Sequence, residues 1–144
     1  MKIMNNFNYI ENMIIRETAR LNDRENKLIS LEYIRISLSR ERNNIYTVFD
    51  TLQYLAFEGT VNATSQNNII NNFPDVRLEA IKILGQFNII QTRRVLMEVL
   101  KYENNSLVLQ ETLKLLFSNW SDFYSNNDEI NIIINAIEKI NILN

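Results

Sequence analysis

The side chains that remain for chemistry in this chain are carboxylates, lysines, tyrosines and hydroxyls, because its 144 residues include no cysteine and no histidine. These absences exclude thiolate nucleophiles, imidazole general bases, disulfides and zinc sites built on Cys or His. No two carboxylates stand at a spacing that indicates acid–base catalysis. We therefore expect no catalytic residue, no metal site and no cofactor, and a protein that is not an enzyme.

Arg77 is a charged residue at a position where an apolar residue is expected. On a helical wheel it falls between Leu84 and Ile81, inside the apolar arc of its predicted helix. A charge at such a position needs a partner. The partner is either a structural group of a neighbouring helix or a ligand such as a phosphate.

Polar residues at corresponding positions of three predicted helices are the candidates for a protein-binding face. They are Asp50 and Gln53, Glu79 and Lys82, and Glu111 and Lys114. A face with more acids than bases lacks the positive potential that phosphate binding requires. The chain has a net charge of −2, so nucleic acid is not an expected partner. Against this, residues 1–42 are mildly basic, and Arg16, Arg20 and Arg24 are spaced four apart.

A second candidate surface is the last predicted helix, 129–140. Its apolar residues cover an arc wider than one neighbouring helix needs, and they include Ile133 and Ile137. An exposed apolar face of this kind indicates a contact with another chain. We expect this helix to bind either a partner protein or a second copy of the chain.

Helices must position the residues above, because an all-β fold needs many turns. Two glycines and one proline are too few of the residues that form them. Apolar residues at helical spacing predict eight helices. Their ranges are 3–21, 24–42, 45–58, 62–73, 74–85, 92–101, 106–117 and 129–140. The short connections between them favour antiparallel neighbours.

The first two helices show contrasting apolar patterns. The first is amphipathic, with its stripe at Ile3, Phe7, Ile10, Ile14 and Leu21. The second carries two stripes about 160° apart at 100° per residue. One contains Leu31, Ile34 and Leu38, and the other contains Ile29, Tyr33 and Ile36. Two stripes predict a helix that packs between two neighbours.

The chain also repeats itself. Residues 76–84 align with residues 108–116 at a shift of 32, and residues 51–56 give a weaker match to residues 80–85. A period in this range is typical of stacked helical repeats. The sequence therefore predicts an all-α, right-handed α-solenoid of antiparallel helix pairs in a single domain, 1–144. Residues 1–42 form non-repeat helices and residues 43–144 the repeats.

The spacing D-V-R-x-x-A-x-x-x-L-G at residues 75–85, followed by the helix around 94–100 and by Glu103-Asn104-Asn105, resembles the HEAT repeat. The closest likeness is to the short bacterial variety also seen in phycobilin lyases. The resemblance implies structural roles for Asp75, Arg77 and Gly85, with Arg77 paired to an Asp or a carbonyl of the adjacent repeat. It also implies a scaffold or adaptor that binds another protein.

The same resemblance leaves two alternatives open, a nucleic-acid-binding protein similar to HEAT-like DNA glycosylases and a ligand holder of the lyase type. HEAT-like glycosylases hold an abnormal nucleotide with aromatic residues and an acid, and the cluster Trp120, Asp122, Phe123 and Tyr124 has that composition. The simpler interpretation is that aromatic burial fixes a long connection. The sequence shows no signal peptide and no apolar run that could span a membrane, so we expect a cytoplasmic protein.

Overall fold

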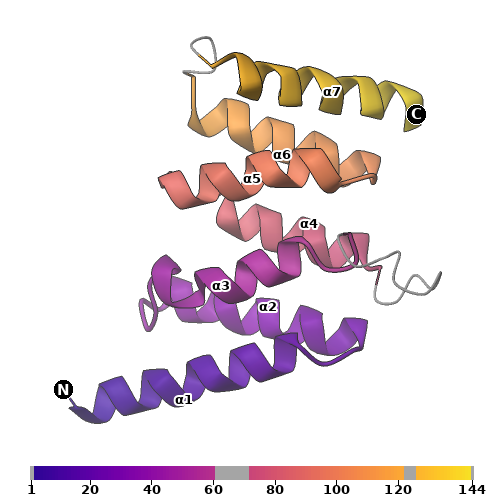
Figure 1. The fold of residues 1–144 in the computed structure, drawn as a ribbon. Helices are drawn as coiled ribbons and strands as arrows, with labels where there is room; N and C mark the ends of the chain where they lie inside the picture. The colour runs from indigo at the N-terminus through magenta and orange to yellow at the C-terminus, as the bar shows by residue number, and fades with distance from the viewer. Residues whose placement is uncertain (1, 61–71, 122–125, 144) are drawn as a thin grey trace.

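A computed structural model describes residues 2–60, 72–121 and 126–143, with side chains from residue 8 onward. Within these ranges the chain forms seven α-helices and no strand, which confirms the all-α prediction (Figure 1). The helices are α1 Lys2–Ala19, α2 Arg24–Ser39, α3 Ile45–Ala56, α4 Pro74–Leu84, α5 Ile90–Tyr102, α6 Ser106–Asn119 and α7 Asn127–Leu143. The predicted helix 62–73 lies almost wholly outside the described residues. No described helix has the length and apolar character to cross a membrane.

Local side chains explain where several helices begin. Asp23 precedes α2 and accepts a hydrogen bond from the backbone N–H of Asn26 at 2.7 Å. Asn44 caps α3 in the same way, and Asn105 caps α6 by accepting from the backbone of Leu107 and Val108. Pro74 is the first residue of α4, where its missing N–H has no cost.

Most of the helices pack on the next helix in the chain, on the helix after that, or on both. Contacts join α2 to α4, α4 to α6, α1 to α3 and α5 to α7, in addition to the contacts between successive helices such as α1–α2, α3–α4 and α6–α7. Figure 1 shows the chain progressing from α1 at one end to α7 at the other. We refer to α1, α3, α5 and α7 as the odd-numbered helices and to α2, α4 and α6 as the even-numbered helices.

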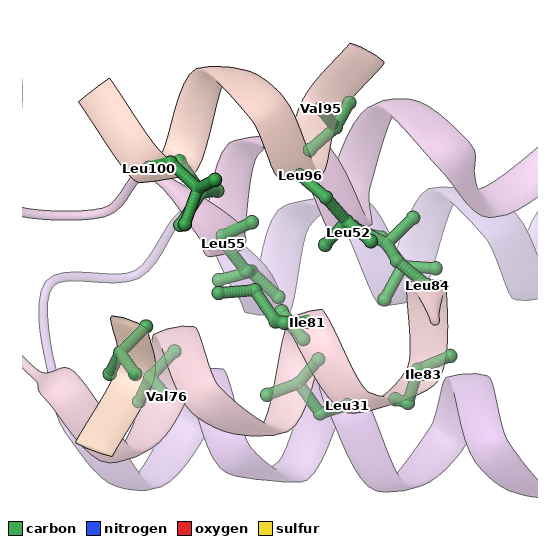
Figure 2. Packing of buried hydrophobic residues seen from close by; sticks show 14 of the residues in the cluster. Leu31, Leu52, Leu55, Val76, Ile81, Ile83, Leu84, Val95, Leu96 and Leu100 are labelled. Atoms are coloured by element: carbon green, nitrogen blue, oxygen red, sulfur yellow. The ribbon is translucent and has the colours of Figure 1, made fainter. Parts of the chain in front are cut away.

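The core runs along the interior from Ile15 of α1 to Ile133 of α7 as one cluster of buried apolar residues. Figure 2 shows its central part, where Leu52 of α3, Ile81 of α4 and Leu96 of α5 point into the same space. All three side chains are fully buried. The sequence repeat at 76–84 and 108–116 supplies the corresponding core residues of α4 and α6.

The two N-terminal helices differ from the sequence prediction. Ile29 and Tyr33 of α2 are 47% and 45% exposed, so the expectation that both stripes of α2 are covered is wrong for these residues. In α1 the apolar stripe faces solvent at Ile10 and Ile14, and the helix buries Ile15 on its other side. Periodicity shows which residues share a face, but it does not show on which side the neighbours lie.

Gly85 is required by packing and not by its backbone conformation. Its φ of −67° is that of an ordinary helical residue. A Cβ atom built on Gly85 would lie 2.5 Å from Cδ1 of Leu115, because α4 and α6 approach closely at this point. The carbonyl oxygen of Gly85 also accepts a hydrogen bond from Nδ2 of Asn119 at 2.7 Å. Gly59 is the residue with a left-handed conformation, at φ 83°, where the turn after α3 needs a glycine.

We expect Gly85→Ala to destabilise the protein by about 1–3 kcal/mol, the usual cost of overpacking. Urea denaturation of the wild type and the variant measures this difference. In a Leu115→Ala background the space is open, and the same Gly85→Ala change should cost much less. An equal cost in both backgrounds would show that the contact with Leu115 is not the reason for the glycine.

Candidate functional site

Arg77 forms a buried two-pronged ion pair with Glu103. Its Nε donates to Oε2 of Glu103 at 2.7 Å and its Nη2 donates to Oε1 at 2.8 Å. The two side chains are 4% and 1% exposed. Nη1 donates further to the carbonyl oxygen of Glu58 and to Oδ1 of Asn72, each at 2.9 Å. Protein groups therefore engage all three guanidinium nitrogens, which supports a structural role over a ligand-binding one.

Glu103 also forms hydrogen bonds within the turn between α5 and α6. Its Oε1 also accepts hydrogen bonds from the backbone N–H groups of Asn104 and Asn105 at 3.1 and 3.0 Å. One ion pair thus links the end of α3, the start of α4 and the α5–α6 turn. The resemblance to HEAT repeats implied an Asp or a carbonyl as the partner of Arg77, and the structure has a Glu and a carbonyl.

Asp75 has a similar role closer to the surface. Its Oδ2 accepts from Nε of Arg24 at 2.6 Å, which joins α4 to the first turn of α2. Both side chains are nearly half exposed. The paired carboxylate raises the pKa of Arg24, so the guanidinium stays charged. Solvent screening makes such an exposed pair a minor contributor to stability.

Three more charged side chains hold helix ends in place. Lys27 is fully buried and donates to the carbonyl oxygen of Ala19, the last residue of α1, at 2.8 Å. Arg93 of α5 pairs with Glu129 at the start of α7, with Nη2 to Oε1 at 2.7 Å. The sequence analysis did not single out Lys27 or Glu129. Their partners lie far away in the sequence, so no local pattern marks them.

Lys139 of α7 completes this set. Its Nζ donates to the carbonyl oxygens of Leu100 and Glu103 at 3.1 and 2.8 Å, at the C-terminal end of α5. Cations are favoured at this end of a helix by the dipole and by the carbonyls that lack helical partners. Burial lowers the pKa of Lys139, and the nearby carboxylate of Glu103 opposes that shift.

The structure divides the six polar candidates between the two sets of helices. Glu79 and Lys82 lie on α4, 3.7 Å apart, and Glu79 also pairs with Arg35 of α2. Glu111 and Lys114 lie on α6, which packs against α4. Asp50 and Gln53 are exposed on α3, which packs against α1, α2 and α4. Four candidates therefore belong to the even-numbered helices and two to an odd-numbered helix.

The two isoleucines proposed for α7 have different environments. Ile133 is 7% exposed and belongs to the core cluster, whereas Ile137 is 43% exposed. Ile134 is exposed to a similar degree. The surface of α7 that remains for a partner therefore contains Ile134 and Ile137, with Ile133 on the inner side of the helix.

Exposed tyrosines are the feature that the sequence analysis missed. All five described tyrosines are between 36% and 65% exposed, and four of them lie on odd-numbered helices: Tyr9, Tyr46, Tyr54 and Tyr102. Tyr46 and Tyr54 of α3 share its exposed side with Asp50 and Gln53. We call the exposed side of α3 that contains Tyr46 and Tyr54 the tyrosine face, and Tyr102 is exposed at the end of α5.

Tyr54 is held in place by two cations. The guanidinium of Arg20 lies 5.2 Å from its ring centroid and Nζ of Lys27 lies 5.3 Å away. Burial and the neighbouring Glu58 carboxylate raise the pKa of Tyr54.

The described cavities do not supply a catalytic arrangement. One of about 650 Å³ lies between α1 and the α2–α3 turn and is lined by Asn8, Asn12, Arg42 and Asn44, among others. Asn44 is engaged as the cap of α3, and Arg42 pairs with Glu11 at 2.9 Å. In the part of the chain that the structure describes, no group of His, Cys, Asp or Glu could hold a metal ion.

Comparison of the chain with protein-family models, curated proteins and solved structures finds no match. Trp120 follows α6 and packs partly buried against the core. Asp122, Phe123 and Tyr124 of the predicted aromatic cluster lie outside the described residues.

We expect Arg77→Ala to lower the free energy of unfolding by about 3–5 kcal/mol, because it leaves the buried carboxylate of Glu103 without its partner. Denaturation in urea at neutral pH measures the loss. Arg24→Ala removes an exposed ion pair from the same helix and serves as the control, with little expected change. Equal effects of the two substitutions would contradict a structural role for the Arg77–Glu103 pair.

Proposed function

We propose that this chain is a non-enzymatic scaffold or adaptor that binds another protein. In this proposal the helices form a right-handed α-solenoid of antiparallel pairs, similar to short HEAT repeats, with an eighth helix within 62–73. The packing of helices on their next-but-one neighbours supports the repeat arrangement. The resemblance of residues 75–85 to a HEAT repeat supports the family.

The main support for this proposal is the tyrosine face. Tyrosine combines a large apolar ring with a hydroxyl that donates and accepts hydrogen bonds, and it is enriched in protein interfaces. Tyr46, Tyr54 and Tyr102 project from helices whose ends are fixed by buried charges. A rigid surface of this kind loses little conformational entropy on binding.

The charge of the same region favours a protein partner of mixed polarity. Asp50 and Gln53 lie beside the tyrosines of α3, and on α5 Lys101 pairs with Glu98 at 2.7 Å. Elsewhere, arginines such as Arg35, Arg42 and Arg93 are paired with carboxylates. A nucleic-acid groove needs an excess of basic side chains along its length. The local charge balance therefore supports a protein over a nucleic acid.

We expect the double substitution Tyr46→Ala and Gln53→Ala to weaken partner binding by about tenfold or more, as is usual for truncation at an interface centre. The measurement is quantitative capture from the native cell extract by the immobilised chain, followed by an affinity titration with the captured protein. Glu111→Ala and Lys114→Ala on α6 form the matched control and should leave the affinity unchanged.

If only the α6 variant loses affinity for the captured protein, the binding surface lies on the even-numbered helices. That result would contradict the proposal for the tyrosine face. Capture of nucleic acid in place of protein, with an affinity that falls steeply as salt rises, would contradict the proposed class of partner.

A further inference from the structure

Helix α1 exposes its apolar side and buries a more polar one. Ile10, Met13 and Ile14 of this side are 56%, 42% and 52% exposed. The side that faces the rest of the protein contributes Ile15 and Ala19 to the core. Large aliphatic side chains aligned along an exposed helix indicate a surface that another chain covers.

The spacing of this stripe is that of a coiled-coil seam. Within α1, residues 10, 14 and 17 follow intervals of four and three, and in the sequence the same intervals extend back to residues 7 and 3. Leu21 follows two residues after the end of the helix. Apolar residues that alternate at intervals of three and four form the line along which one helix packs against another. Glu17 is the one polar residue in the series.

The neighbouring side of α2 extends the stripe into a groove. Tyr33 and Ile29 of α2 are nearly half exposed. A largely apolar cavity of about 240 Å³ lies here, lined by Ile10, Ile14, Ile15 and Tyr33 and by the Glu11–Arg42 ion pair. A third helix can pack in an apolar groove that two antiparallel helices form.

The contact between α1 and the rest of the protein is incompletely satisfied. Among the described residues, four buried side-chain polar atoms lack a hydrogen-bond partner. Three of them, Glu11 Oε2, Asn12 Oδ1 and Arg42 Nε, belong to the junction of α1 with the end of α2. The inner side of α1 is thus the more polar of its two sides, and its outer side has more apolar surface.

We propose that α1 packs against α1 of a second copy of this chain, in antiparallel orientation across a two-fold axis, with the edge of α2 completing the interface. The occupant of the groove must be a helix with an apolar stripe at intervals of three and four, and α1 itself has that stripe. In a two-fold contact the same surface serves both copies, so each α1 covers the other.

The other end of the molecule does not offer an equivalent surface for a head-to-tail contact. On α7 the side farthest from the core contains Asn131, Asn135 and Glu138, all exposed and polar, with Ile142 as its one apolar residue. Ile134 and Ile137 are exposed nearer the core. On α1 and α2, by contrast, the exposed apolar residues Ile10, Ile14, Ile29 and Tyr33 belong to two helices packed together, and we expect this surface to meet its own copy.

The charges on α1 select the antiparallel orientation. In a parallel pair, Glu17 of one copy would face Glu17 of the other within the seam, and like charges at such positions are destabilising. An antiparallel pair centred between Ile14 and Glu17 sets each carboxylate opposite Ile14 of the second copy. Arg16, which is exposed, flanks the seam and can pair with the Glu17 carboxylate of the second copy.

Light scattering and sedimentation equilibrium of the full chain over a wide concentration range test the proposal. We expect a dimer for the wild type and a monomer for the double variant Ile10→Glu and Ile14→Glu. The matched control is Ile134→Glu and Ile137→Glu on α7, which should remain a dimer. Circular dichroism confirms that each variant is folded. A wild type that stays monomeric, or an α1 variant that dimerises like the wild type, would overturn the proposal.

The absence of cysteine from the chain allows a second, independent test. A single Ile14→Cys substitution lies close to the two-fold axis, so it should form a rapid intermolecular disulfide under mild oxidation. Ile142→Cys, at a residue that is 83% exposed on α7, is the control and should not. Ile10→Cys lies far from the two-fold axis of an antiparallel pair, so it should not cross-link to itself. Equal cross-linking at residues 14 and 142 contradicts the interface, and self-linkage at residue 10 contradicts its antiparallel orientation.

Discussion

The buried ion pair between Arg77 and Glu103 is the interaction on which the arrangement of the central helices depends. A guanidinium and a carboxylate removed from water are tolerated only when each is paired and hydrogen-bonded, and here Glu58, Asn72 and two backbone N–H groups complete the set. Because these groups come from α3, α4 and the α5–α6 turn, the pair has one geometry in which it is satisfied. That geometry fixes how the central helices pack.

Similar contacts hold the remaining helix ends, with Lys27 between α1 and α2, Arg93 with Glu129 between α5 and α7, and Lys139 at the end of α5. These contacts occupy several basic side chains inside the protein. The exposed surface includes tyrosines, mixed charges and apolar stripes. This is the frame that we propose binds another protein. The tyrosine face and the outer side of α1 are two separate surfaces with different chemistry, one amphipathic and one apolar.

Local signals made much of the fold predictable, since the periodicity of apolar residues locates most of the described helices to within a few residues. Long-range pairing was not predictable, because Glu103 lies 26 residues from Arg77 and no local pattern links them. The orientation of α1 was missed for a related reason, since an apolar stripe can face the core or a partner. For α7 the wide apolar arc was correctly recognised, but only the structure separates buried Ile133 from exposed Ile137.

Buried charges fix the core, and in our proposal the N-terminal helix α1 is covered only when two copies of the chain associate. Amide hydrogen exchange of the wild-type chain, measured at low and at high protein concentration, tests both parts at once. We expect α4 and α5 to exchange slowly at both concentrations, and α1 to exchange quickly at low concentration and slowly at high concentration. Fast exchange in α4, or exchange in α1 that does not change with concentration, would contradict the account.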